Sequence, residues 1–501
     1  MFRSALTLAV VLLSHSLALA GTLKDEVAGL MKAMGPRKGV VAISVRDSDG
    51  NEVVNFKGDQ PVMPASNQKL LTSGTALMLL GPDFNFETRL LRNGERLTVV
   101  GDGDPSFGDP EMLSSMTYTD AQGQKHQGMT IDALLALWTD AVRAAGMTSV
   151  RELVVDDRVF DRSNCHVDWP VDQLHEPYCA EVSGLNFHAN HLDFWAVPSP
   201  RGAEVTRIEP ACTFVPIRNA TTPGKTRDDG LWIAREADSN SFTVRGFLRQ
   251  ALKAPVSVSI DAPPDFFGKL LAERLRKAGV AVDAVRVIAA EEPPSTGSPI
   301  GPVIRTPIAA IVRRCNVDSQ NLYAECLLKR VGRQVSDAPG SWTNGCEAME
   351  RLVSGRVGGA AGLNAADGSG LSRENRVTAS LMTGWISHLT RDSAVARPFL
   401  ASLAVGGTSG TVQKRFRDLD PSLATVRCKT GYIDGVCSLS GVVDCTNGHQ
   451  PTFSVICNGF EGDGVGKAKQ LQEAVAKAIA RTYGKLPERL PQQPRPALGG
   501  G

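Results

Sequence analysis

The stretch Lys38-Gly-Val-Val-Ala-Ile-Ser-Val-Arg46 alternates along its length in a way that is typical of a β-strand. Turn residues follow in Asp47-Ser-Asp-Gly50, and Glu52–Phe56 is predicted to be the return strand. A helix is predicted before this hairpin, over Leu23–Met34. The N-terminal part of the chain therefore predicts a helix beside two antiparallel strands.

The C-terminal part of the chain carries matching signals. Asn447-Gly448 marks a turn between two predicted strands, and a helix with apolar residues at helical spacing closes the series. The three strands and the helix are predicted over Ala424–Thr430, Ser438–Asp444, Thr452–Asn458 and Lys467–Tyr483. These elements indicate one antiparallel sheet that is assembled from both ends of the chain, with the end helices packed on it.

The middle of the chain has a different sequence pattern. From about Leu91 to Ile288, short β-like runs are broken by Pro, Gly and Asp, and helix returns at Pro264–Ala278. A segment that interrupts one sheet is an inserted domain, and Pro198–Pro255 is predicted to be a further β insert. The predicted fold class is α/β (α+β), with segments 1–20 (signal peptide), 21–90 and 290–485 (main domain), 91–197 and 256–289 (insert), 198–255 (nested insert) and 486–501 (disordered tail).

The composition is that of an ordinary globular protein. The 501 residues include 54 Lys and Arg against 53 Asp and Glu, which gives a net charge of +1. This balance argues against a protein that binds nucleic acid through bulk charge. The length suggests two to four domains at roughly 100–200 residues each.

The first twenty residues are typical of a secretory signal peptide. One positive charge at Arg3 precedes an apolar run that is short for a membrane span, which needs about 20 apolar residues. The run ends in Ala18-Leu19-Ala20, a small-x-small pattern for cleavage before Gly21. We expect export to the periplasm or the cell exterior, with no transmembrane anchor after cleavage. The alternative is an uncleaved anchor.

Ten cysteines all lie after residue 164, and their even number in an oxidising compartment favours several disulfides whose pairing the sequence does not select. No Cys-x-x-Cys pair and no zinc-like Cys/His spacing occurs. His188-Ala-Asn-His191 lacks the glutamate of the His-Glu-x-x-His arrangement, so we expect surface or core histidines. No metal and no cofactor is predicted.

The first candidate for chemistry is Pro64-Ala-Ser66-Asn-Gln-Lys69, which opens an Ala/Leu-rich helix. Ser66 and Lys69, three residues apart, share one helix face, so the amine can reach the hydroxyl. A serine becomes a good nucleophile when a base takes its proton, and a buried lysine near other cations can be that base. The alternative is a capping serine beside a solvated lysine.

Two further motifs follow. Ser319-Gln320-Asn321 lies between two predicted helices, where Ser319 is either a proton shuttle or simply a helix cap, and the Asn321 amide would bind a substrate backbone group. Lys429-Thr430-Gly431 ends a predicted strand. Its ammonium and hydroxyl suit a carboxylate, and its glycine permits a close backbone approach. The alternative is a strand end with an exposed lysine.

The three motifs in this order form the Ser-x-x-Lys, Ser-x-Asn, Lys-Thr-Gly set of β-lactamases and penicillin-binding proteins. The chain resembles the low-molecular-mass penicillin-binding proteins that are D-Ala-D-Ala carboxypeptidases and endopeptidases. The gap of about 250 residues between the first two motifs also fits that family, in which extra domains are inserted there. Further landmarks are Gly101–Ser106, Val154–Asp157, Ser319–Glu325, Asp367–Val377 and Gly435–Gly441.

The resemblance implies a role for each matching residue. Ser66 is the acylated nucleophile and Lys69 its general base, while Ser319 relays the proton and Asn321 holds substrate. Lys429 tunes the Ser319–Lys69 pair and receives the substrate carboxylate with Thr430. Gly431 and Tyr432 belong to the substrate-binding strand, where the N–H groups of Ser66 and Tyr432 would form the oxyanion hole.

The resemblance further implies a penicillin-binding, β-lactamase-like domain with an antiparallel sheet flanked by helices and two β-rich inserts. The expected partners are peptidoglycan peptides as substrates and β-lactams as covalent inhibitors. Two residues depart from the family pattern. Gln320 replaces a commoner Asp or Asn, and Tyr432 replaces a small hydroxyl residue and would narrow the pocket. The alternatives are a β-lactamase or esterase-like hydrolase of the same fold, and a non-catalytic protein that binds the cell wall.

Overall fold

The computed structural model describes residues 21–119, 124–224 and 230–489, so the predicted signal peptide and most of the predicted tail lie outside the described residues. The described residues form two compact units. Unit 1 draws on Met1–Asp83, Val312–Gln320 and Trp342–Gly501, and unit 2 on Phe84–Ile311 and Asn321–Ser341. Both units combine helices with sheets, which confirms the predicted α+β class.

Unit 1 is built on a six-stranded antiparallel sheet in the order β17-β18-β19-β20-β1-β2. Its strands are β17 (Ala404–Val405), β18 (Ala424–Ile433), β19 (Val436–Cys445), β20 (Thr452–Asn458), β1 (Val40–Arg46) and β2 (Glu52–Phe56). β1 pairs along its whole length with β20, from Val40 opposite Asn458 to Arg46 opposite Thr452. The expectation that both ends of the chain build one sheet is confirmed.

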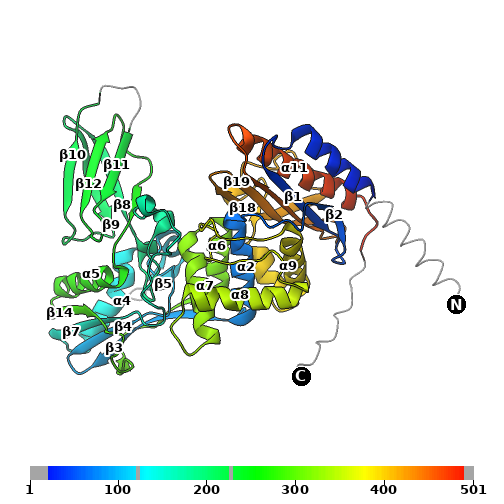
Figure 1. Ribbon diagram of the computed structural model, residues 1–501. Helices are drawn as coiled ribbons and strands as arrows, with labels where there is room; N and C mark the ends of the chain where they lie inside the picture. Colours follow the sequence, from blue (N-terminus) through cyan, green and yellow to red (C-terminus); the bar gives the residue numbers. More distant parts are fainter. Residues whose placement is uncertain (1–20, 120–123, 225–229, 490–501) are drawn as a thin grey trace, which may run out of the picture. The chain divides into compact units, whose positions relative to one another are not determined.

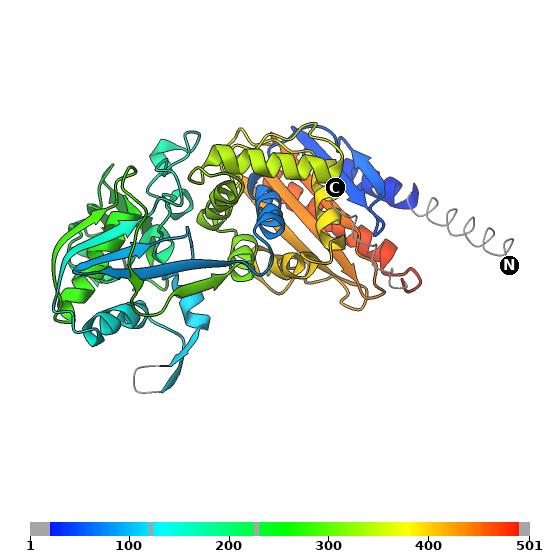
Figure 2. The same cartoon turned by 90° about the horizontal axis from the view of Figure 1, so that it is seen from below.

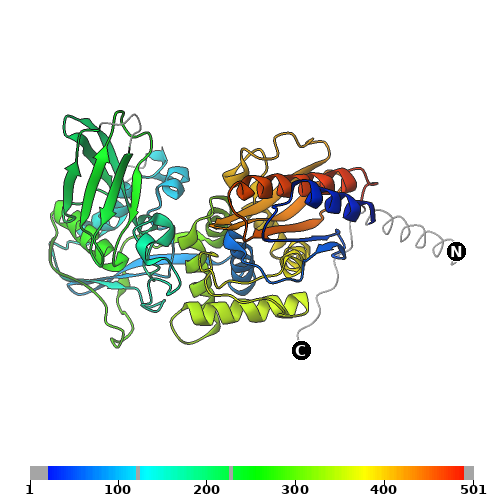
Figure 3. The ribbon, with the colours of Figure 1, turned by 45° about the horizontal axis from the view of Figure 1, so that its top comes forward.

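One face of this sheet is apolar. A helix over residues 21–34 and α11 (Gly464–Tyr483) lie on it, as Figures 1 and 3 show. Because side chains alternate along a strand, Ile43 and Val45 of β1 both point to this face. They pack in one core with residues of both helices, including Leu23, Val27, Leu471 and Ile479.

The opposite face is covered by helices and carries buried hydroxyl groups. The helices here are α2 (Gln68–Leu79), α8 (Trp342–Val357), α9 (Ala379–Arg391) and α10 (Ala396–Ser402), and α9 packs on β1, β19 and β20. Ser438, Ser440 and Ser454 are buried on this side of β19 and β20. A single 3₁₀ turn, η1 (Ala65–Asn67), precedes α2 and packs on β18 and β19.

Unit 2 contains a mixed sheet in the order β14-β7-β4-β3-β15, with β16 also paired to β3. Its strands are β14 (Ala281–Val287), β7 (Ser149–Asp156), β4 (Arg96–Val100), β3 (Asn85–Asn93), β15 (Ser298–Pro299) and β16 (Ile304–Pro307). Helix α5 (Pro263–Lys277) packs on β7 and β14 and contacts α4 (Ile131–Ala144) (Figures 1 and 2). Further elements are α3 (Pro110–Ser115), β5 (Thr117–Thr119), β6 (Lys125–Gln127) and α7 (Asn321–Val335).

Two three-stranded sheets complete unit 2, in the orders β13-β8-β9 and β10-β12-β11. Their strands are β8 (His191–Ser199), β9 (Gly202–Glu209), β10 (Ile217–Thr221), β11 (Gly230–Arg235), β12 (Phe242–Phe247) and β13 (Val256–Ser259). Ile233, Phe242 and Val244 belong to the same hydrophobic core as Trp138 and Phe267. The predicted nested insert over 198–255 thus shares a core with the rest of unit 2, and its status as a separate domain stays a prediction.

Candidate active site

Ser66 lies in the turn η1, and Lys69 lies in the first turn of α2. The Lys69 Nζ is 3.0 Å from the Ser66 Oγ, and it also donates a hydrogen bond to the carbonyl of Ser369 at 2.8 Å. Lys69 is fully buried, whereas Ser66 is half-buried. The three-residue spacing therefore produces the predicted contact between amine and hydroxyl, with the hydroxyl at the more accessible end.

The turn that carries Ser66 is anchored to the sheet. Ser438 Oγ donates to the Pro64 carbonyl at 2.6 Å. With the Asn67 amide oriented so that both of its polar atoms are satisfied, its nitrogen donates to the Lys429 carbonyl at 2.8 Å and its oxygen accepts from Ser440 N at 3.2 Å. These bonds fix η1 on β18 and β19.

Gly431 allows this close approach. A Cβ atom at this position would lie 2.9 Å from both Ser66 N and Pro64 O, and 2.2 Å from Ser438 Oγ. Ordinary contacts of a Cβ atom begin at 3.4 Å. The glycine of the third motif is therefore explained by packing, because it lets the strand lie directly beneath the turn that carries Ser66.

A loop that follows α8 supports Lys69. The Asp367 carboxylate accepts hydrogen bonds from Gly370 N at 2.7 Å, Ser372 N at 2.6 Å and Asn375 Nδ2 at 2.9 Å. This buried carboxylate holds the loop in a tight turn, and the loop presents the Ser369 carbonyl to the lysine. The sequence shows this segment only as a family landmark, and the role of Asp367 in supporting the lysine was not predicted.

A second pair of amine and hydroxyl is formed by Lys429 and Ser319. Lys429 Nζ donates to Ser319 Oγ at 2.7 Å and to the Thr430 carbonyl at 2.8 Å. Burial holds the pKa of Lys429 well below its usual range, and the positive charge of Lys69 lowers it further. Ser319 has a backbone φ of 62°, in the left-handed region that is uncommon for residues other than glycine.

The edge of β18 that faces away from β19 is open at Tyr432, beyond the end of its pairing with β17. The two-residue turn Asp434-Gly435 makes Ile433 and Val436 a hydrogen-bonded pair, so the N–H of Tyr432 points away from β19 by alternation. β17 pairs with β18 only at Arg427 and Cys428, and therefore does not reach this N–H. The Tyr432 side chain is 58% exposed.

Two hydroxyl groups meet at the same end of the strand. Thr430 Oγ1 lies 2.7 Å from Thr411 Oγ1, which belongs to the short turn η5 (Gly410–Val412). No motif in the sequence identifies Thr411. The Cys428 side chain joins the apolar core on the face of β18 opposite to Lys429, as strand alternation predicts.

Asn321 is placed in unit 2, where it opens α7 and its amide donates to the Tyr178 carbonyl at 2.8 Å. The other predicted site residues lie in unit 1. Among them the structure pairs Ser66 with Lys69 and Ser319 with Lys429. Chemically, each lysine amine beside a serine hydroxyl can move that hydroxyl's proton. Of the described residues, one group has the composition and spacing of a metal site, namely His188, His191 and Asp193 in unit 2.

Comparison with known proteins gives consistent matches. The family model described as the D-Ala-D-Ala carboxypeptidase 3 (S13) family matches residues 24–481. A D-alanyl-D-alanine carboxypeptidase from Actinomadura sp. (strain R39) is 29% identical over 494 residues, which cover 93% of this chain and 86% of that protein.

Two crystal structures of penicillin binding protein 4 (dacB) from Haemophilus influenzae are also similar, each at 19% identity. The first has a TM-score of 0.74 and covers 92% of this chain and 99% of the other. The second, in complex with a β-lactam, has a TM-score of 0.68 and covers 91% and 99%. At this identity the two structures show a shared fold.

Proposed function

The chain belongs to the D-Ala-D-Ala carboxypeptidase 3 (S13) family, and from this premise we propose that it cleaves the D-Ala-D-Ala bond of peptidoglycan stem peptides through an acyl-enzyme on Ser66. The observation that carries the assignment is the 3.0 Å contact between Lys69 Nζ and Ser66 Oγ. Family membership does not favour the β-lactamase, esterase or non-catalytic alternatives.

In the first step Ser66 Oγ attacks the carbonyl carbon of the penultimate D-Ala, and Lys69 accepts the hydroxyl proton. The attack turns the carbonyl oxygen into an oxyanion. The N–H groups of Ser66 and Tyr432 are the proposed donors to this oxygen, and removing one such donor typically costs about 10²–10³-fold in rate. The outward direction of the Tyr432 N–H supports this role.

In the second step the peptide C–N bond breaks, and the leaving amine receives the proton that Lys69 took from Ser66, which makes Lys69 neutral again. Ser319 is the proposed relay for this proton, and a hydrogen bond from Lys429 Nζ at 2.7 Å holds its Oγ. The leaving D-Ala carries a carboxylate, which suits the Lys429 ammonium and the Thr430 hydroxyl. Water then attacks the acyl-enzyme, with Lys69 as the base, and returns Ser66 to its starting state.

Three parts of the assignment rest on sequence alone. The binding of substrate by Asn321 follows from the Ser-x-Asn motif. Cleavage of crosslinks, in addition to removal of the terminal D-Ala, follows from the family resemblance. Export follows from residues 1–20. Within the described part of the chain, no helix combines the length and the apolar character that a membrane crossing requires.

The experiment compares the wild-type protein with Ser66→Ala in labelling by a fluorescent penicillin and in release of D-Ala from purified muropeptides. We expect covalent label and D-Ala release from the wild type, and neither from the variant. Equal labelling of the two proteins would overturn the assignment of Ser66. Analysis of the same digests for loss of crosslinked dimers separates terminal trimming from endopeptidase cleavage.

A further inference from the structure

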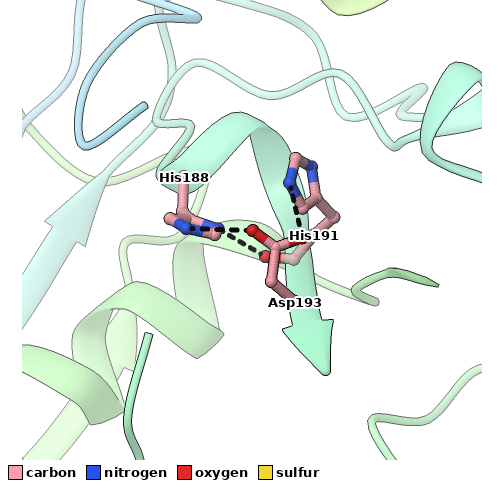
Figure 4. A group of neighbouring side chains, drawn as sticks. All are labelled: His188, His191 and Asp193. Carbon is pink, nitrogen blue, oxygen red and sulfur yellow. Dashed lines mark hydrogen bonds and ion pairs between the residues drawn. The ribbon is translucent and has the colours of Figure 1, made fainter. Parts of the chain in front are cut away.

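Unit 2 brings two imidazoles and one carboxylate together at the start of β8. His188 lies in the 3₁₀ turn η4 (His188–Asn190), and His191 and Asp193 lie on the strand that follows. His188 Nε2 is 3.7 Å from Asp193 Oδ2, and His191 Nε2 is 3.4 Å from Asp193 Oδ1. Figure 4 shows the three side chains converging from these two elements.

The state of the His188 ring follows from its contacts. Its Nδ1 is 2.9 Å from the His191 carbonyl, which can only accept, so Nδ1 carries a hydrogen and the ring turns Nε2 toward Asp193. This Nε2 is buried without a hydrogen-bond partner among the described residues.

Without a proton, His188 Nε2 is an electron-pair donor like the Asp193 carboxylate, and the two face each other inside the protein. Buried polar atoms normally have a partner, because an unsatisfied one is costly. A divalent cation between these two groups would satisfy both of them. With His191 added, the group has the composition and spacing of a ligand set.

Two of the three side chains, His188 and Asp193, are also oriented by neighbouring groups, as metal ligands usually are. The His188 ring is fixed by the bond from Nδ1 to a backbone carbonyl. Asp193 accepts a hydrogen bond from Ser257 Oγ on the paired strand β13. The backbone N–H of His188 donates to the Phe107 carbonyl at 2.9 Å, which holds the turn in place.

We propose that His188, His191 and Asp193 bind one divalent transition-metal ion, with Zn²⁺ as the expected ion. Two imidazoles and one carboxylate are typical zinc ligands, and tetrahedral zinc places its ligand atoms about 3.3 Å apart. The three ligating atoms lie within 4.8 Å of one another, so small side-chain rotations suffice. The His191 side chain is 18% exposed, so solvent can reach a fourth ligand position on its side.

The sequence did not predict this site because the His-x-x-His pair was compared with a pattern whose third group is a glutamate inside the motif. Here the carboxylate comes from Asp193, two residues beyond the pair. The turn η4 supplies the geometry, since His188, Ala189 and Asn190 all have positive φ angles, and a regular helix would place the two rings differently.

The test is Zn²⁺ binding to the full chain after treatment with EDTA, measured by equilibrium dialysis. We expect one tightly bound Zn²⁺ per chain, and at least ~100-fold weaker binding for Asp193→Asn and for His191→Gln. His175→Gln is the matched control, because His175 also lies beside a carboxylate, that of Glu176 at 3.5 Å, but has no second imidazole there. This control should bind Zn²⁺ like the wild type.

The thermal midpoint of each metal-free variant and its rate of penicillin acylation at Ser66 report whether it folds. The wild-type protein gives a second readout that needs no variant: Co²⁺ bound by nitrogen and oxygen ligands shows d–d bands without a thiolate charge-transfer band. A thiolate band would assign the metal to cysteines and overturn the proposal. So would the absence of a tight site in the wild type, or equal affinity in wild type and a folded Asp193→Asn.

Discussion

Replacement of Gly431 by alanine tests whether the strand beneath the nucleophile's turn sets the position of Ser66. The added Cβ would lie 2.9 Å from Ser66 N and Pro64 O, whereas ordinary contacts begin at 3.4 Å. The turn and the strand must therefore separate by about 0.5 Å. Both contacts are with backbone atoms, so a side-chain rotation cannot relieve them.

The size of the effect follows from this displacement. A misplacement of 1 Å can cost about 10²-fold in rate, so half of that displacement corresponds to about tenfold, or about 1.4 kcal/mol of transition-state stabilisation. Overpacking a tight contact also destabilises a fold by roughly 1–3 kcal/mol. We expect Gly431→Ala to lower both the acylation rate and the thermal midpoint.

The assay is the second-order rate constant of acylation by a chromogenic penicillin, measured beside a thermal melt. The matched control is Gly230→Ala, since Gly230 also lies in a strand but a Cβ there meets nothing within 4 Å. The control should behave like the wild type in both measurements. If Gly431→Ala had the acylation rate constant and the thermal midpoint of the wild type, the steric argument would be refuted.

Three further predictions concern the same site. Thr411→Val removes the hydroxyl 2.7 Å from Thr430 Oγ1 and should raise KM for D-Ala-terminated peptides about two- to tenfold, whereas an unchanged KM would exclude a role in carboxylate binding. Asn67→Ala removes a buried amide that bonds the Lys429 carbonyl and Ser440, and should cost about 1–3 kcal/mol in urea unfolding; a loss below 0.5 kcal/mol would contradict the contact. The pKa of Lys429 is lowered, so between that lowered pKa and its usual value near 10.5 the unfolded chain binds a proton that the folded chain lacks, and stability rises with pH. Lys429→Met should reduce this slope in urea titrations from pH 7 to pH 10, and an identical slope in the variant would contradict the lowered pKa.

Much of unit 1 is predictable from local sequence pattern. The strand predicted over Thr452–Asn458 is β20, with the same bounds, because turn residues precede a short run that is rich in apolar and β-branched residues. β18 extends to Ile433, past the predicted end at Thr430, because the turn is formed by Asp434-Gly435 and the Lys-Thr-Gly motif stays inside the strand. The family inferred from the three motifs is confirmed by the match over residues 24–481.

The features of the fold and the site that the sequence does not predict depend on contacts between residues that are distant in sequence. No local pattern marks Thr411, whose hydroxyl contacts Thr430. Asp367 begins a family landmark, but its role depends on the loop that folds around its carboxylate. In the insert, β10 pairs in parallel with β12, while β11 lies at the other edge of β12. Alternation predicts strands there but does not choose between such pairings.

The pairing of β1 with β20 has a consequence for the newly made protein. β1 leaves the ribosome early, but its partner is completed only at Asn458, after the whole of unit 2. Contacts of such high sequence separation form slowly and leave strand edges open to aggregation. Until translation passes Asn458, the edge of β1 that pairs with β20 stays open, and a chain that stops before Thr452 can never complete the sheet beside Ser66.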